Sequence, residues 1–162
     1  MNIIFLDIDG VLNSNIEKSP YNKELSSGKI IDNDKVKLLS QLVNQTSSKI
    51  VLHSGWKYWF DKNISPLNPE AQHLIDLLDE NGLAIYDITP DLATDEIKRS
   101  KKFSLVKASE ILQWIDTHSV ENWIVLDDLD LHNSIVSEHQ IKTDSQTGLT
   151  KSDIEAAKMQ MR

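Results

Sequence analysis

Two aspartates near the start of the chain stand at the end of an apolar run. Asp7 and Asp9 close the segment 3–8, whose β-branched and aromatic residues are typical of a buried strand. Residues two apart on a strand point the same way, so both carboxylates can face one small volume. Gly10 then lets the chain turn sharply away. The pair is therefore placed to act together on one ion or ligand.

A second pair of acids ends a later apolar run. Asp127 and Asp128 follow the segment 122–126. Because they are adjacent, their side chains point to opposite sides for as long as the strand persists. We expect Asp128 to enter the site and Asp127 to orient loops or the first ligand.

Carboxylates gathered from both pairs would repel one another. At ~4 Å each pair of charges costs roughly 4 kcal/mol at an intermediate effective dielectric, and a bound cation removes that cost. The chain has no cysteine and no histidines at ligand spacing, and oxygen ligands alone favour Mg²⁺ over Zn²⁺. A hard ion held by few carboxylates keeps positions for water and phosphate oxygens. This is the outline of a phosphoryl-transfer site.

The elements that would position these acids alternate along the chain. Apolar runs predict strands at 3–8, 49–53, 83–88 and 122–126, and a weak one at 139–143. Helical spacing and capping residues predict helices from about 32, from Asn68–Pro69, over 104–117 and from about Thr150. The alternation predicts an α/β fold, a Rossmann-like doubly wound parallel sheet with helices on both faces. Right-handed crossovers then put all the strand ends, including Ser54, on one edge, where ligands bind.

Length and composition limit the alternatives. The 162 residues suit one domain over 1–162, in which the polar stretch 11–31 forms a flap or loop. The lack of cysteine excludes disulfides, thiol catalysis and cysteine-based zinc sites. A formal net charge of −8 does not favour nucleic acid as a partner, although a local basic cleft is compatible with it.

The chain also lacks the features of membrane and exported proteins. No apolar run approaches the ~18 residues of a membrane span. The apolar N-terminal run is interrupted by acids and follows no basic region, unlike a signal peptide. We expect no membrane partner and a cytoplasmic location.

Four segments resemble the motifs of the haloacid dehalogenase (HAD) superfamily, in the order of that family. They are Asp-Ile-Asp-Gly-Val-Leu at 7–12, the apolar run ending in Ser at 50–54, Lys107 at the start of a helix, and the acidic strand end at 124–128. An Asp-x-Asp-Gly motif alone also occurs in calcium loops. Four ordered motifs that span nearly the whole chain are far more specific.

The resemblance also bears on size and subfamily. The intervals between motifs are short, which implies a HAD core with a minimal cap or none. Residues 54–57, Trp114 and 148–150 look like the small HAD domains of RNA-repair proteins, a weaker likeness.

The resemblance implies a role for each acid. Asp7 would be the nucleophile that forms an aspartyl-phosphate, and Asp9 would protonate the leaving alcohol and then activate water. Mg²⁺ would lie between Asp7, the backbone carbonyl of Asp9 and Asp128, with Asp127 in support. An acid at position 9 indicates phosphatases and phosphotransferases rather than dehalogenases.

The same resemblance assigns the phosphate-binding groups. Ser54, with Gly55, would bind phosphoryl oxygens, and Lys107 would neutralise charge on the nucleophile and the phosphate. Ser54 can instead cap a helix, and both roles can hold together. Lys107 competes with three neighbouring basic residues, Arg99, Lys101 and Lys102.

Other residues near the motifs receive structural roles. The aromatic residues that follow Ser54 are expected to pack rather than to stack on a base or sugar. These are Trp56, Tyr58, Trp59 and Phe60. His53 is expected to be a core histidine.

Together these observations predict a Mg²⁺-dependent phosphohydrolase, a phosphatase that acts on a phosphate monoester. Its substrate would be a phosphorylated small molecule or the phosphorylated end of a larger one. Two alternatives stay open: a non-catalytic metal-binding or regulatory HAD-like domain, and a nucleic-acid end phosphatase. A receiver-like signalling domain also gathers acids, Mg²⁺ and a lysine, but its acids occur in the reverse order along the chain.

Overall fold

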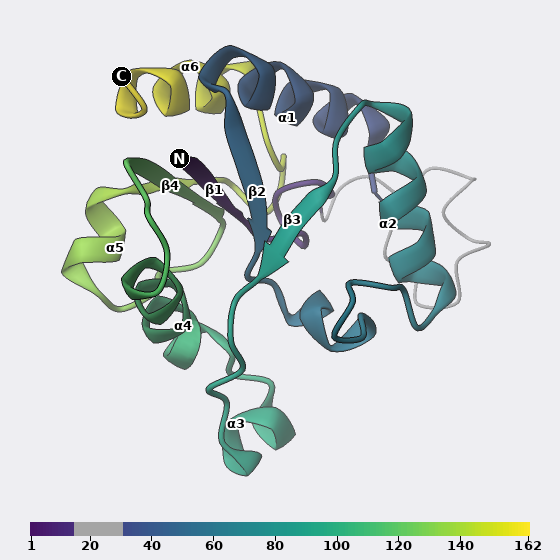
Figure 1. Cartoon of the computed structure of the whole chain (residues 1–162), viewed down its shortest axis with the longest axis vertical. Coiled ribbons are helices and arrows are strands. Elements are labelled where there is room, and N and C mark those ends of the chain that lie inside the picture. Colours follow the sequence, from purple (N-terminus) through teal and green to yellow (C-terminus); the bar gives the residue numbers. More distant parts are fainter. Residues whose placement is uncertain (15–30) are drawn as a thin grey trace.

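Five parallel strands form the centre of the molecule (Figure 1). The computed structural model describes residues 1–14 and 31–162, so the predicted flap lies largely outside the described residues. The strands are β1 (Asn2–Leu6), β2 (Ser48–Leu52), β3 (Ile85–Ile88), β4 (Asn122–Asp127) and β5 (Gln140–Lys142). Their order is β3-β2-β1-β4-β5, with β1 at the centre. The predicted α/β fold with a doubly wound parallel sheet is confirmed.

The register brings three strand ends level. Leu6, the last residue of β1, pairs with Leu52 on one side and with Leu126 on the other. The chain leaves β1 toward β2 on one side, whereas β4 and β5 lie on the other. The strand order therefore reverses at β1, which is where open α/β sheets bind ligands.

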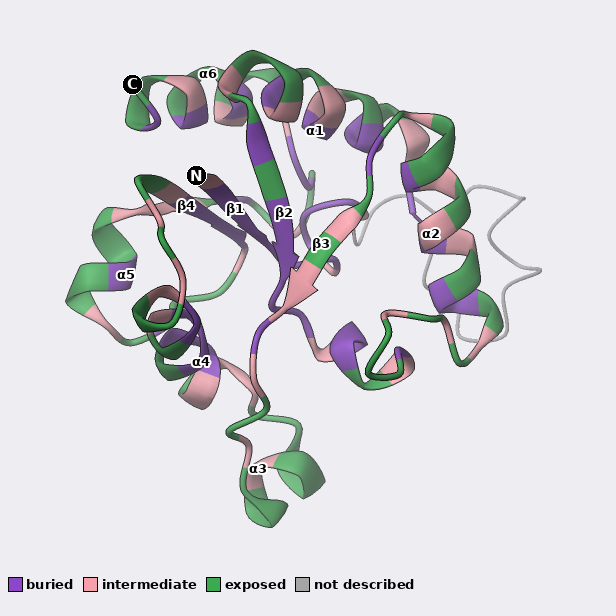
Figure 2. Cartoon of the chain, viewed as in Figure 1, coloured by how far each residue is buried: buried purple, intermediate pink, exposed green. Residues whose placement is uncertain are grey.

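Helices cover both faces of the sheet because side chains alternate along each strand. Ile4, Leu6 and Leu52 share one core with α1 (Asn33–Thr46), α2 (Pro69–Glu80) and α6 (Lys151–Gln160). Ile3 and Phe5 share the other with α4 (Ser104–Asp116) and α5 (Ser134–Glu138). Figure 2 shows the central strands mostly buried between these layers.

Local sequence signals explain where the longer helices begin. Asn68 accepts a hydrogen bond from the Ala71 amide and is followed by Pro69, as predicted for the start of α2. Thr150 and Asp153 form a reciprocal capping box at the start of α6. These caps fix the helix starts and therefore the lengths of the loops that reach the sheet edge.

Of three short elements, two were not predicted from the sequence, and the helix that Ser54 caps was left as an alternative. A 3₁₀ helix, η2 (Gly55–Trp59), follows β2, and α3 (Asp95–Ser100) lies in the polar stretch after β3. The third is α5. Each has five or six residues, too few for an apolar stripe to repeat, and α3 has no buried residue. In Figure 1, α3 projects from the lower end of the molecule, beyond the sheet.

The structure also bears on the membrane. Among residues 1–14 and 31–162, no helix has both the length and the apolar character that crossing a bilayer requires.

Candidate active site

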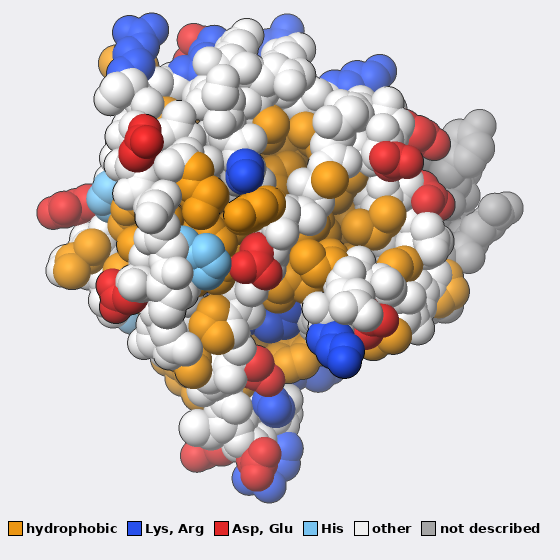
Figure 3. Space-filling view, viewed as in Figure 1, with side chains coloured by type: hydrophobic (Ala, Val, Ile, Leu, Met, Phe, Trp, Pro, Cys, Tyr) orange, Lys and Arg blue, Asp and Glu red, His pale blue; other side chains and the backbone are white. Residues whose placement is uncertain are grey.

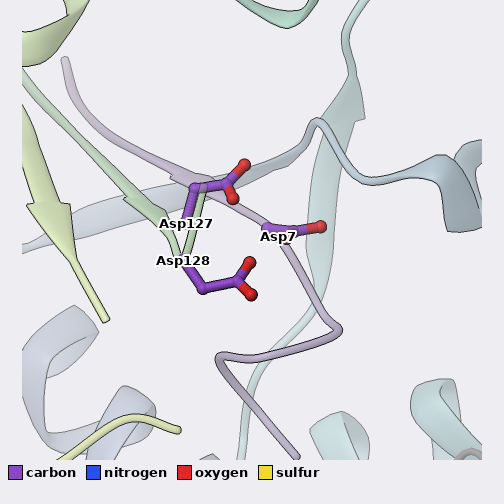
Figure 4. Close-up of side chains that lie close together, drawn as sticks. All are labelled: Asp7, Asp127 and Asp128. Carbon is purple, nitrogen blue, oxygen red and sulfur yellow. The ribbon is translucent and has the colours of Figure 1, made fainter. Parts of the chain in front are cut away.

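Three carboxylates converge where β1 and β4 end. Asp7 follows β1, Asp127 is the last residue of β4, and Asp128 comes next. One oxygen from each lies within 4.8 Å of the other two. Figure 4 shows the carboxylates of Asp127 and Asp128 on the side of Asp7. The level strand ends bring them together, because the Asp7 amide donates to the Leu126 carbonyl at 3.0 Å.

Asp127 and Asp128 do not point to opposite sides of the sheet. β4 ends at Asp127, so Asp128 has already left the strand and its carboxylate turns toward Asp7. Asp127 is fully buried and accepts a hydrogen bond from the Leu129 amide at 2.9 Å. Asp128 is half-buried and lines a cavity. Side chains alternate between the two faces of the sheet only as far as Asp127, so the alternation expected from the sequence does not extend to Asp128.

Gly10 makes room for Asp128. Its φ is +81°, and a Cβ at this position would lie 2.4 Å from Cγ and Oδ2 of Asp128. Its amide donates to Oδ1 of Asn13, and its carbonyl accepts from the Thr143 hydroxyl at 2.7 Å. The turn after β1 is therefore fixed in a conformation that only glycine fits.

Lys107 supplies positive charge to the cluster from the first turns of α4. Its Nζ lies 2.8 Å from Oδ2 of Asp127 and 3.5 Å from Oδ2 of Asp7. Burial favours the neutral amine, but the carboxylates of Asp7 and Asp127 outweigh this effect and raise the pKa of Lys107. Of the basic residues considered from the sequence, Lys107 is the one whose ammonium contacts two of the acids.

Asp7 and Asp128 hold protons more tightly than usual, since each has a raised pKa. Burial raises the pKa of Asp7 to about 6, against the opposing effect of Lys107. Burial and the charge of Asp7 raise the pKa of Asp128 to about 7. One ammonium does not balance three carboxylates, so the cluster favours binding either protons or a cation.

His53 lies beneath the cluster as a core residue. It is 1% exposed, and neither ring nitrogen has a hydrogen-bond partner among the described residues. Burial lowers its pKa to about 3, so the ring is neutral, although Nε2 lies 3.5 Å from Oδ2 of Asp127. The sequence interpretation of His53 as a core histidine agrees with this burial.

A cavity of about 480 Å³ opens above the cluster and takes in the other residues predicted for the site. Asp7, Ser54 and Lys107 line it, and Asp9, Gly55 and Asp128 complete the predicted set there. Asp127 lies behind this surface. Residues that are far apart in the sequence thus meet at one edge of the sheet. The largest separation, between Asp7 and Asp128, is 121 positions.

Ser54 has a structural role that leaves its hydroxyl proton available. Its Oγ accepts the Trp56 amide at 3.1 Å and so caps η2. A hydroxyl can accept and donate at once, so the same group can donate into the cavity. The cap and the proposed phosphate contact are therefore compatible.

Asp9 is held by two side chains: Asn13, to which the sequence analysis assigned no role, and Trp56, for which it predicted packing alone. Asn13 Nδ2 donates to Oδ1 at 2.9 Å, and the indole Nε1 of Trp56 donates to Oδ2 at 3.1 Å. Trp56 lies two residues after Ser54 and Asn13 four after Asp9. Their closeness to two motifs could have marked both residues as candidates for the site. The hydrogen bond from the Trp56 indole to Asp9 joins two strand ends, and no sequence pattern predicts it.

Aromatic and basic side chains form the outer walls of the cavity. Tyr58 and Trp59 of η2 line the cavity together with Lys98, Lys101 and Phe103. The rings of Tyr58 and Phe103 are 5.5 Å apart. Trp56 and Phe60 pack in the core, as predicted, but Trp56, Tyr58 and Trp59 also line the cavity. In Figure 3, basic and acidic side chains are mixed at the lower end of the molecule, where α3 projects.

A buried ion pair ties these walls together. Lys57 Nζ of η2 lies 3.1 Å from Oε1 of Glu110 on α4, and both side chains are at most 6% exposed. The same ammonium donates to Thr89 Oγ1 at 2.9 Å and to the Pro90 carbonyl at 3.1 Å. The Leu92 amide donates to the other oxygen of Glu110. The segment after β3 is thereby fixed against both η2 and α4.

Comparison with known proteins agrees with this geometry. Residues 3–154 match the family described as the HAD domain in Swiss Army Knife RNA repair proteins. The chain belongs to this HAD family. The match includes β1, the cluster at the end of β4 and every residue assigned above to the HAD site. No curated protein and no solved structure matches the chain.

The role of Gly10 in this HAD domain can be tested by a matched pair of substitutions. Gly10→Ala and Gly82→Ala both place a side chain at positive φ, which costs about 1–2 kcal/mol. Only Gly10→Ala also forces a Cβ against Asp128, since nothing lies within 4 Å of a Cβ at Gly82. We expect urea denaturation to show a clearly larger loss of unfolding free energy for Gly10→Ala. Equal losses would contradict the close packing of Gly10 on Asp128.

Proposed function

We propose that this HAD domain is a phosphatase that hydrolyses phosphate monoesters through an aspartyl-phosphate at Asp7. The observation that carries the proposal is the convergence of Asp7, Asp127 and Asp128 beside Lys107, at the base of a cavity. A nucleophile, a group that can transfer protons and donors for phosphoryl oxygens would then share one small volume. The cytoplasmic location expected from the sequence stays a prediction.

Each residue would act from the position described. An oxygen of Asp7 attacks phosphorus, and the bond to the leaving oxygen breaks as Asp9 gives that oxygen a proton. Ser54 and Lys107 bind the phosphoryl oxygens and stabilise charge that develops on them. Asp9 then takes a proton from water, whose oxygen attacks phosphorus and releases Asp7.

The donor set fits Mg²⁺. Asp7 and Asp128 are both oxygen donors that face the cavity, and burial, together with neighbouring carboxylates, raises the pKa of each, so a cation bound between them would stabilise their charged forms. Asp7, Asp128 and the backbone carbonyl of Asp9 would hold the ion, with Asp127 behind them. When bound, Mg²⁺ would neutralise negative charge on the carboxylates and on the phosphate group of the substrate.

A nucleic-acid end is the second candidate substrate, favoured by the walls of the cavity. Tyr58 and Phe103 present aromatic faces on which a base can stack, and Lys98 and Lys101 can approach a phosphodiester. The family description, which refers to RNA repair, points the same way. We expect activity on phosphorylated oligonucleotides, if these are the substrate, to fall steeply with salt. Activity that is insensitive to salt would favour a small substrate.

Replacing Asp7 tests the proposed nucleophile. We expect Asp7→Asn to abolish phosphate release from p-nitrophenyl phosphate with Mg²⁺, because an amide is a poor nucleophile. Asp116→Asn, at an exposed position on α4, is the matched control and should keep the wild-type rate. Chelation of the metal with EDTA should also stop the wild-type enzyme.

Two results of that assay would count against the proposal. Turnover by Asp7→Asn at the wild-type rate would exclude covalent catalysis at Asp7. A wild-type protein that releases no phosphate from a broad panel of monoesters would favour the non-catalytic metal-binding alternative.

The metal site can be tested without turnover. Mg²⁺ at a hundredfold excess over its Kd should stabilise the wild-type protein by about 2.7 kcal/mol. Asp128→Asn should stabilise the metal-free protein, because it removes a charge from the crowded cluster, and should lose most of the Mg²⁺ effect. Thermal unfolding with and without Mg²⁺ measures both effects. An undiminished Mg²⁺ shift in Asp128→Asn would exclude Asp128 as a ligand.

A further inference from the structure

Trp56 contacts two groups of the proposed site at once. Its backbone amide donates to Oγ of Ser54, and its indole Nε1 donates to Oδ2 of Asp9, both at 3.1 Å. The side chain is 2% exposed and packs in the core, with its ring 4.7 Å from that of Trp59. A rigid residue on η2 therefore spans the ends of β1 and β2.

The opposite oxygen of Asp9 is also held. Asn13 Nδ2 donates to Oδ1, and Oδ1 of Asn13 accepts the Gly10 amide, both at 2.9 Å. The second bond fixes which way the Asn13 amide faces. Donors on both sides thus set the plane and the direction of the Asp9 carboxylate.

We infer that Trp56 is a positioning residue for proton transfer, which orients Asp9 toward the leaving group. The inference rests on the proposed phosphatase function. Trp56 Nε1 and Asn13 Nδ2 both donate and cannot accept, so each oxygen of Asp9 accepts one hydrogen bond from a fixed direction. Together the two bonds orient the carboxyl group that gives its proton to the leaving oxygen. Trp56 also contacts both Asp9 and Ser54, so it fixes the distance between the proposed acid, Asp9, and the proposed phosphate-binding hydroxyl of Ser54.

The proton and electron pairs balance in both half-reactions. As the bond from phosphorus to the leaving oxygen breaks, the proton of the Asp9 carboxyl group moves to that oxygen, and the electron pair of its O–H bond stays on the carboxylate. In the second half-reaction, a water proton moves to the Asp9 carboxylate while the water oxygen bonds to phosphorus. The bond from phosphorus to Asp7 then breaks and its electron pair returns to Asp7.

Trp56→Phe tests the inference, because it keeps an aromatic ring and the backbone donor to Ser54. The probes are p-nitrophenyl phosphate, whose leaving group departs as a stable anion, and p-nitrobenzyl phosphate, whose alkoxide needs a proton. A positioned acid contributes about 10²–10⁴-fold where protonation is needed. We expect kcat for the benzyl ester to fall about tenfold more than kcat for the phenyl ester.

Two controls separate positioning from a general structural role. Trp114→Phe removes an equally buried indole donor, whose Nε1 bonds Oδ2 of Asp87 at 2.8 Å, away from the cavity lining. It should leave the ratio of the two kcat values unchanged. In an Asp9→Asn background, Trp56→Phe should no longer change that ratio, because the group it positions is gone.

Each outcome decides a different claim. An equal fall on both esters, an unchanged ratio, or a persistent effect in the Asp9→Asn background would overturn the positioning role. If Trp56→Phe does not fold, as judged by circular dichroism, Asn13→Ala removes the other donor to Asp9 and should shift the ratio in the same direction. A wild-type protein inactive on both esters would overturn the proposed function instead.

Discussion

The site depends on negative charge that is concentrated where water screens it poorly. Asp7 and Asp127 are almost fully buried, and Asp128 lies against them. Lys107 balances one of these three carboxylates, and the pKa values of Asp7 and Asp128 rise in response to burial and mutual repulsion. This imbalance is the basis for the proposal that the cluster binds a cation and that Asp7 attacks phosphorus.

The rest of the fold keeps this charge in place. Level strand ends bring the acids together, Gly10 makes room for Asp128, and the Lys57–Glu110 pair fixes the walls of the cavity. A buried pair of this kind is costly to break, since either partner alone would be an uncompensated charge. The walls therefore have a fixed position relative to the acids, without a large cap domain among the described residues.

The sequence was sufficient for the architecture and for the set of site residues near the motifs. Apolar runs that alternate with predicted helices identified all five strands. The order of the motifs predicted that Asp7, Ser54 and Lys107 lie at one edge of the sheet, and all three line the same cavity. The sequence placed the end of β4 within one residue, but it could not reveal that Asp127 and Asp128 both turn toward Asp7, because that depends on the partners of β4 in the sheet. The contacts of Trp56 join separate strand ends, and no local pattern encodes such a contact.

The central claim is that Asp7 can be phosphorylated beside a divalent ion shared with Asp128. Beryllium trifluoride mimics a phosphoryl group on an aspartate, so a crystal structure of the protein grown with Mg²⁺ and this compound tests the claim directly. We predict beryllium bonded to an Oδ atom of Asp7, with its fluorides within reach of Ser54 and Lys107, and Mg²⁺ in contact with Asp7 and Asp128. Beryllium trifluoride absent from Asp7, or Mg²⁺ bound away from both aspartates, would contradict the account.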